Sequence, residues 1–108
     1  MSDQMKRYDE YVELQRNGQV SEAVAGFVKL TQDYPDFALP YNALAANSKK
    51  EGKILDAVKY IEKYCQLEPN DAFGFSILSS YHIAAGNHEG AEEALAKVSE
   101  LRFKEQFE

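Results

Sequence analysis

GKILDAVKYIEKYCQLEP, residues 52–69, carries a glycine, an alanine and a proline at spacings that recur on both sides of it. Intervals of 34 residues connect Gly18, Gly52 and Gly86, then Ala23, Ala57 and Ala91, then Pro35, Pro69 and, in the last place, Phe103. A fixed period of about 20 to 50 residues is typical of a solenoid, in which each unit buries its apolar face against its neighbours. The pattern therefore predicts three tandem units.

Length and composition fit a single folded domain over residues 1–108. Three short units fill nearly all of the 108 residues, and a core of this size can form without disulfides or metal. Apolar residues make up 44% of the chain, with seven Tyr and six Phe, as in globular rather than disordered proteins.

The charge balance disfavours two classes of partner. Eighteen acidic and twelve basic residues give a net charge of −6, which opposes general binding to nucleic acid or to anionic membranes. A single cysteine, Cys65, cannot form an intramolecular disulfide and fits a reducing compartment. The polar start MSDQMKRYDE has no signal-peptide core, so we expect a cytoplasmic protein.

Apolar residues at helical spacing predict six helices, paired by short loops into antiparallel hairpins. The first four expected helices run over about residues 4–16, 20–33, 36 or 37 to 50, and 54–67. The fifth is capped at residue 70 or 71 and runs to 86, and the sixth runs from 88 towards 107. The three units then cover residues 4–37, 38–71 and 72–105. The three recurring glycines are expected at helix C-termini, where a positive φ is easiest for a residue without Cβ. The recurring alanines are expected where paired helices approach closely.

Helical hairpins with glycine, alanine and proline at these spacings resemble the tetratricopeptide repeat (TPR) family, whose pattern runs W-x2-L-G-x2-Y, then A-x3-F, then P. The second half of the pattern matches Ala23, Phe27 and Pro35, then Ala57, Ile61 and Pro69, then Ala91 and Leu95. The first half matches Tyr41, Leu44, Ala45 and Ser48, then Phe75, Leu78, Ser79 and His82, and less well Arg7, Glu10, Tyr11 and Leu14. A register shifted by one residue, using Tyr8, Tyr11 and Val12, is a second possibility for the first helix.

The resemblance implies an all-α, right-handed α-solenoid of three hairpins whose concave surface binds a peptide or protein segment. The family's binding positions correspond to Tyr8, Val12, Arg16, Asn42, Ala46, Lys49, Lys50, Phe73, Ser76 and Ser80. Met5, Gln15, Leu39, Ile83 and Ala84 complete the same inner face. Three cations on this face of an acidic chain suggest a peptide with acidic residues or a free carboxylate. Alternatively, these cations only complement the negative ends of their helices.

One subclass of the family is excluded by its residues. Members that clamp the C-terminal carboxylates of heat-shock chaperones carry Lys, Asn and Arg at five places. Those places here hold Tyr8, Val12, Ala43, Phe73 and Ile77. We therefore do not expect chaperone-tail binding.

The sequence allows two other functions, self-association and catalysis. We expect a monomer or a weak homodimer. A self-associating module would use an uncovered C-terminal edge formed by Val98, Leu101, Phe103 and Phe107. An enzyme would have to pair Cys65 as nucleophile with His82, but the usual catalytic and phosphate-binding motifs are missing and a buried, inert thiol is the simpler interpretation. His82 and His88 are a weak metal motif. We expect no enzyme, cofactor or metal.

Overall fold

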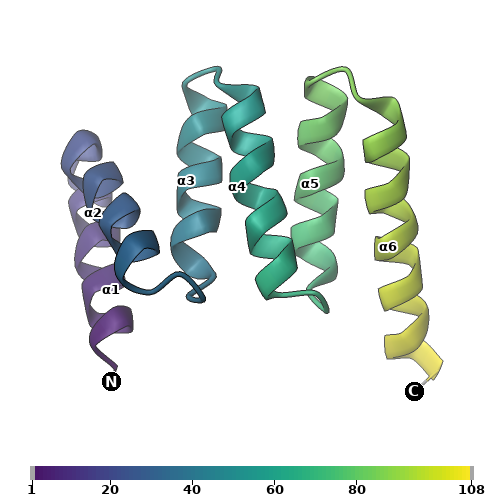
Figure 1. Ribbon diagram of the computed structural model, residues 1–108, viewed down its shortest axis with the longest axis horizontal. Coiled ribbons are helices and arrows are strands. Elements are labelled where there is room, and N and C mark those ends of the chain that lie inside the picture. The colour runs from purple at the N-terminus through teal and green to yellow at the C-terminus, as the bar shows by residue number, and fades with distance from the viewer. Residues whose placement is uncertain (1, 108) are drawn as a thin grey trace.

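The computed structural model describes residues 2–107, which fold into six helices and no strand. The helices are α1 (Asp3–Arg16), α2 (Val20–Asp33), α3 (Leu39–Lys50), α4 (Ile54–Leu67), α5 (Ala72–Ala84) and α6 (His88–Phe107). Each packs against the next one along the chain, so the α1–α2, α3–α4 and α5–α6 hairpins follow one another as three units of an all-α solenoid (Figure 1). The predicted fold class is confirmed.

The turn inside each hairpin has the same backbone geometry. Gly18, Gly52 and Gly86 have φ of 87°, 77° and 79°, a region that residues with a Cβ rarely adopt. The amide after each glycine donates back to the last turn of the preceding helix: Gln19 to Leu14 at 2.9 Å, Lys53 to Ser48 at 2.8 Å and Asn87 to His82 at 2.8 Å. These are Schellman caps. Because all three recur at 34 residues, α1 has the unshifted register.

The loops between hairpins end differently from one another. Asp71 caps α5 as expected, since its Oδ1 accepts from the Phe73 amide at 3.0 Å. The prediction that the third helix starts at residue 36 or 37 is wrong, because α3 begins at Leu39. The physical reason is Phe37, whose buried ring packs against Tyr8 at a centroid distance of 5.9 Å and keeps the preceding chain as a loop.

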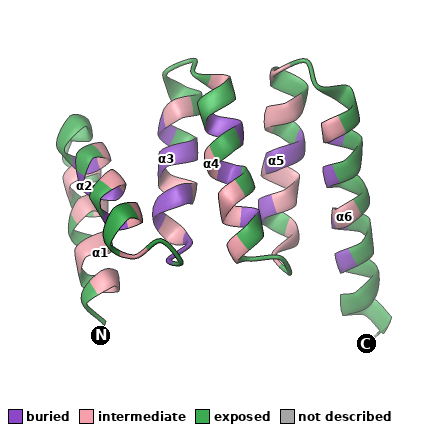
Figure 2. Cartoon of the chain, in the orientation of Figure 1, coloured by how far each residue is buried: buried purple, intermediate pink, exposed green. Residues whose placement is uncertain are grey.

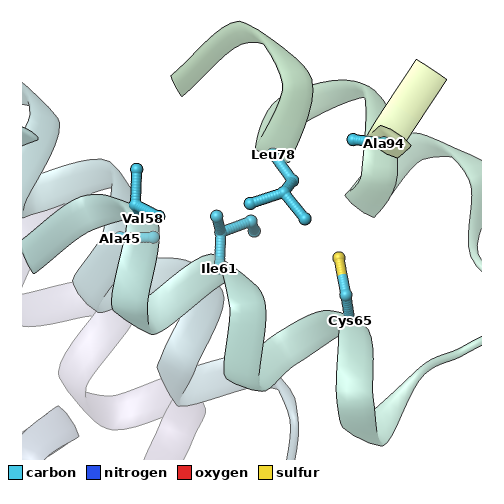
Figure 3. Packing of buried hydrophobic residues seen from close by; sticks show 6 residues of the cluster. All are labelled: Ala45, Val58, Ile61, Cys65, Leu78 and Ala94. Atoms are coloured by element: carbon cyan, nitrogen blue, oxygen red, sulfur yellow. The ribbon is translucent and has the colours of Figure 1, made fainter. Parts of the chain in front are cut away.

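The core forms where the second helix of one unit meets the first helix of the next. Phe27 and Ala23 of α2 lie in one buried cluster with Leu44 of α3. Ile61 of α4 lies in a second cluster with Leu78 of α5 (Figure 3). Both Phe27 and Ile61 are 0% exposed. The units therefore depend on one another for burial of their apolar faces, as expected of a solenoid.

The first unit exchanges a large and a small residue relative to the second. Tyr11 of α1 packs on Gly26 of α2, where an added Cβ would overlap the tyrosine ring. In the second unit the equivalent positions hold Ala45 and Tyr60, which belong to the same cluster. The poor match of Tyr11 to the family's small residue is thus compensated by a glycine on the facing helix.

The sixth helix continues to Phe107, an extension that the sequence allowed without deciding, and its faces differ from the expectation. Val98 and Leu101 are buried and therefore do not form an exposed edge, whereas Leu95, expected in the apolar stripe, is 49% exposed. The spacing of Ala91, Ala94, Val98 and Leu101 places all four on one side of the helix, toward α5. Leu95 lies at the margin of this side, about 100° around the helix axis from Ala94.

Within residues 2–107, no helix combines the length and the apolar character needed to cross a bilayer.

The exchange at Tyr11 and Gly26 can be tested by a double-mutant cycle. In the native background, Gly26→Ala should lower the free energy of unfolding by about 1 to 3 kcal/mol, because overpacking outweighs a helix-propensity gain of about 1 kcal/mol. In a Tyr11→Ala background the same substitution should become neutral or stabilising. Urea unfolding followed by circular dichroism measures both effects. Equal effects in the two backgrounds would contradict the packing described.

Candidate functional site

A hollow lies between α1 and α3, on the side formed by the first helices of the units. It has a volume of about 590 Å³. Its lining residues are Tyr8, Val12, Gln15, Arg16, Val20, Ala43, Ala46, Asn47, Lys50 and Glu51. We call this hollow the α1–α3 groove. Five of the ten predicted binding residues line it: Tyr8, Val12, Arg16, Ala46 and Lys50.

Apolar side chains form the body of the α1–α3 groove. Tyr8 is held in place by its neighbours, with its ring 5.6 Å from Phe27 and 5.9 Å from Phe37 between centroids. Burial, and to a smaller extent the charge of Asp9, raises the pKa of Tyr8 above its ordinary value, so the hydroxyl stays uncharged at neutral pH. Val12 and Ala46 add small apolar surfaces beside it. This part of the groove suits an apolar side chain of a ligand.

Two cations stand at one end of the α1–α3 groove. Arg16 is the last residue of α1 and Lys50 is the last residue of α3. Arg16 contacts Glu13 at 3.1 Å in an exposed pair, which contributes little to stability and leaves the guanidinium available. Within residues 2–107, Lys50 forms no ion pair, and the neighbouring acid Glu51 is paired with Lys53 at 3.5 Å. The end of the groove is therefore locally basic.

The other five predicted residues lie outside the α1–α3 groove. Lys49 is exposed beside Lys50 but does not line the hollow, and Asn42 is half-buried on the same helix. Phe73, Ser76 and Ser80 lie on α5, on the face that also carries the exposed Ile83. The structure thus divides the predicted set into a groove in the first two units and a more open surface in the third.

Four lining residues were missed by the sequence argument: Val20, Ala43, Asn47 and Glu51. Ala43 and Asn47 are each one position after a predicted inner-face residue, on the side of α3 that faces α1. The Asn47 side chain is buried and donates to the Ala43 carbonyl oxygen at 3.0 Å, so its amide is already partnered. Spacing alone identifies the inner face of a helix but not which flank of that face borders a hollow.

Two smaller hollows lie along α4 and α5. One, of about 320 Å³, is lined by Glu62, Cys65, Gln66, Phe75 and Leu78. The other, of about 410 Å³, is lined by Leu55, Val58, Lys59, Glu62, His82, Ala85 and Asn87. The first hollow is lined by one charged residue, Glu62, and the second by one residue of each sign, Lys59 and Glu62. Neither hollow therefore concentrates charge of one sign.

Cys65 and His82 do not form the nucleophile–imidazole pair that an enzyme would need. The Cys65 thiol is buried and directed toward the space between Leu78 and Ala94 (Figure 3). Burial, followed by the charges of Asp71 and Glu62, raises the pKa of the thiol to about 11, so it is protonated at neutral pH. The side-chain partner of His82 Nδ1 is instead Asn87 Nδ2, at 3.3 Å. Within residues 2–107, no three His, Cys, Asp or Glu side chains form a group suited to a metal ion.

The thiol assignment predicts slow alkylation that accelerates with pH. At neutral pH, native Cys65 should react with iodoacetamide at least about a hundredfold more slowly than in the urea-unfolded chain, because only the thiolate reacts. The native rate should rise about tenfold per pH unit until the thiol ionises near pH 11, the reverse of a low-pKa catalytic cysteine. Mass spectrometry follows the reaction, with Cys65→Ser as the unlabelled control. A native rate that levels off below about pH 8 would contradict the assignment.

Comparisons with known proteins were informative at the level of structure. No protein-family model and no curated protein sequence matches the chain. A double mutant of MamA RS-1 has a TM-score of 0.86 at 19% identity over 99% of this chain and 60% of that one. The CopN–Scc3 complex gives 0.79 at 19% identity over 89% and 56%. The second TPR of Spaghetti (RPAP3), bound to the HSP90 peptide SRMEEVD, gives 0.79 at 16% identity over 93% of both chains.

The chain spans little more than half the length of the MamA and CopN–Scc3 chains and nearly all of the Spaghetti TPR. Identities of 16% to 19% carry information about the fold alone. That fold agrees with the three hairpins, the glycine turns and the 34-residue period described above. The chain therefore has the tetratricopeptide repeat fold.

Proposed function

We propose that the chain is a protein-interaction module that holds a partner segment carrying acidic residues or a free carboxylate in the α1–α3 groove. The observation that carries the proposal is the placement of Arg16 and Lys50 at one end of an apolar groove, in a chain of net charge −6. The three units, residues 4–37, 38–71 and 72–105, would then serve as one binding domain.

The proposed binding mode uses two kinds of contact. An apolar ligand side chain would rest on Tyr8, Val12 and Ala46, of which Tyr8 is held in position by the Phe27 ring. A ligand carboxylate would be bound by Arg16 and Lys50, with the guanidinium able to form two parallel hydrogen bonds. Apolar contact supplies most of the affinity in such sites, and the charged contact supplies orientation and selectivity.

The remaining inner-face residues would extend the site toward the third unit. Asn42, Ser76 and Ser80 offer donors and acceptors for the backbone of an extended ligand. Phe73 offers an exposed apolar surface on α5, whereas Lys49 lies outside the groove and is not part of the proposed contact surface. This polar, open surface fits a segment that lies across the units rather than one that is enclosed.

The Spaghetti TPR supports the idea that a three-unit surface of this fold can hold a short peptide, since its structure contains the HSP90 peptide SRMEEVD. That peptide is not transferred to this chain. The places of the family's carboxylate clamp are occupied by Tyr8, Val12, Ala43, Phe73 and Ile77, none of which is a cation or a carboxamide. We propose instead a different basic site, formed at the ends of α1 and α3.

No catalytic role is proposed for Cys65, because its thiol is buried and its pKa is raised to about 11. The competing explanation for Arg16 and Lys50 is stabilisation of the negative ends of α1 and α3, worth about 0.3 to 1 kcal/mol each. The two explanations differ in a measurable way. Helix stabilisation changes unfolding, whereas ligand binding changes affinity for anionic peptides.

The proposal predicts opposite outcomes for two adjacent lysines. The probes are short fluorescent peptides with an apolar residue followed by glutamates, with matched peptides that carry glutamine and a C-terminal amide. Lys50→Glu should weaken binding of the acidic peptides about tenfold or more and reduce its salt dependence, because a like charge then faces the carboxylates. Lys49→Glu, on the same helix turn but outside the groove, should change the affinity less than about threefold. Fluorescence anisotropy measures both.

A third variant tests the apolar part of the α1–α3 groove separately from its two cations. Ala46→Phe should fill the α1–α3 groove and weaken the acidic and the amide peptides alike, without loss of fold because Ala46 is exposed. Thermal unfolding confirms that each variant is folded. Equal effects of Lys49→Glu and Lys50→Glu, or selective peptide binding that survives Ala46→Phe, would show that the ligand is not held in this groove.

A further inference from the structure

The outer face of α6 occupies the place where a following unit would pack. Equivalent positions, 34 residues apart, are Phe27 in α2, Ile61 in α4 and Leu95 in α6. The first two are 0% exposed under the next hairpin, whereas Leu95 is 49% exposed. Figure 2 shows the buried residues of α6 on its side toward α5 and exposed residues elsewhere on this helix. The same surface that is covered in two units is therefore uncovered in the third.

The uncovered surface is longer than in the other units. α6 has 20 residues, whereas α2 and α4 have 14. Its additional turns carry Phe103 and Phe107, which are 63% and 65% exposed and whose rings lie 4.6 Å apart between centroids. We define the α6 outer face as the exposed residues Glu92, Leu95, Ala96, Ser99, Arg102, Phe103 and Phe107.

Head-to-tail stacking of copies does not fit this surface. A second copy would have to place α1 on α6 as α3 is placed on α2, with residues 7 and 10 in the positions of Tyr41 and Leu44. Tyr41 and Leu44 are buried, but position 10 holds Glu10, which would lose its hydration, and Arg7 is engaged by Asp33 at 3.0 Å. An open chain of copies is therefore disfavoured, and a closed two-fold pair remains.

We propose that two copies of the chain pair through their α6 outer faces, antiparallel about a two-fold axis at Ser99. Leu95 and Phe103 lie four residues before and after Ser99, on the same face of the helix. In this arrangement Leu95 of one copy lies at the level of the partner's Phe103. Ala96 and Ser99 are small, so the two helices can approach closely at the centre. The apolar residues of the face thus complement themselves.

The charges of the α6 outer face are also self-complementary. Lys97 and Lys104 each contact Glu100 within the helix, at 3.5 and 3.6 Å, so these two lysines are already paired. Glu92 and Arg102 form no ion pair within residues 2–107, although both are exposed. With the axis at Ser99, Arg102 of one copy lies about one helical turn from the partner's Glu92. Each pair of copies would therefore form this contact twice.

The expected dimer is weak. A single pair of helices buries less than the roughly 1,600 Å² of a standard specific interface. Dissociation on dilution is therefore expected, and the two phenylalanines and Leu95 supply most of the affinity. This surface lies on the second helix of the last unit and is separate from the α1–α3 groove of the proposed function.

Sedimentation equilibrium over a wide concentration range tests the pairing. The unmodified chain should pass from monomer to dimer as its concentration rises, and Leu95→Glu should shift it to monomer. Leu55→Glu, at a comparably exposed leucine on α4, is the matched control and should leave the dissociation constant within about twofold of the original. A chain that stays monomeric up to about millimolar concentration, or a dimer unaffected by Leu95→Glu, would overturn the proposal.

Charge reversal tests the antiparallel geometry. Glu92→Arg alone and Arg102→Glu alone should each raise the dissociation constant about tenfold, since each places like charges together twice. The double variant should restore it to within about threefold. Single effects without restoration in the double variant would overturn the axis at Ser99. Peptide binding in the α1–α3 groove should be unchanged by these variants, so failure here is distinguishable from failure of the proposed function.

Discussion

Burial of the outer face of each second helix is the interaction on which the rest of the structure depends. Phe27 is removed from water by Leu44 of the next unit, and Ile61 by Leu78. A single hairpin cannot supply this cover, so the units fold as a stack rather than as independent pieces. The stack in turn aligns the first helices and creates the inner surface on which the groove lies. The same requirement explains why Leu95, at the position equivalent to Phe27 and Ile61, is 49% exposed while they are 0% exposed.

The hairpin turns give the inner surface its register. Because the glycine caps recur at the same place, Arg16 and Lys50 come to equivalent ends of α1 and α3, next to each other across the groove. The third unit has Ala84 at the equivalent position, so the basic end does not continue along the surface. A periodic backbone therefore carries a non-periodic chemical surface, which is how a repeat fold acquires selectivity.

The side chains that fill the space between paired helices differ among the three units. Tyr11 on Gly26 and Tyr60 against Ala45 each place one large ring between helices in the first two units. The third unit has Ser79 and Ala94 at these positions, and Ser79 Oγ instead donates to the Ala91 carbonyl oxygen at 3.1 Å. The third unit thus has a hydrogen bond between its two helices where the first two units have an aromatic ring. Volume changes of this size are felt because protein interiors are close-packed.

Much of the fold followed from local signals in the sequence. The 34-residue period, the glycine turns and the bounds of α2 and α4 were predictable because caps and short loops depend on neighbouring backbone atoms. The inner face of the first helices was also predictable, from helical periodicity and the resemblance to the TPR family. The start of α3 was not, since burial of the Phe37 ring against Tyr8 is a contact between residues far apart in the sequence.

By itself, then, the sequence determined the three hairpins, their register in α3 and α5 and the class of surface they present. Only the tertiary structure decided that Arg16 and Lys50 share a groove while Lys49 does not, that α1 keeps the unshifted register, and that Val98 and Leu101 are buried while Leu95 is exposed. The physical reason is that a helical period specifies which residues share a face, whereas burial depends on which neighbouring helix covers that face.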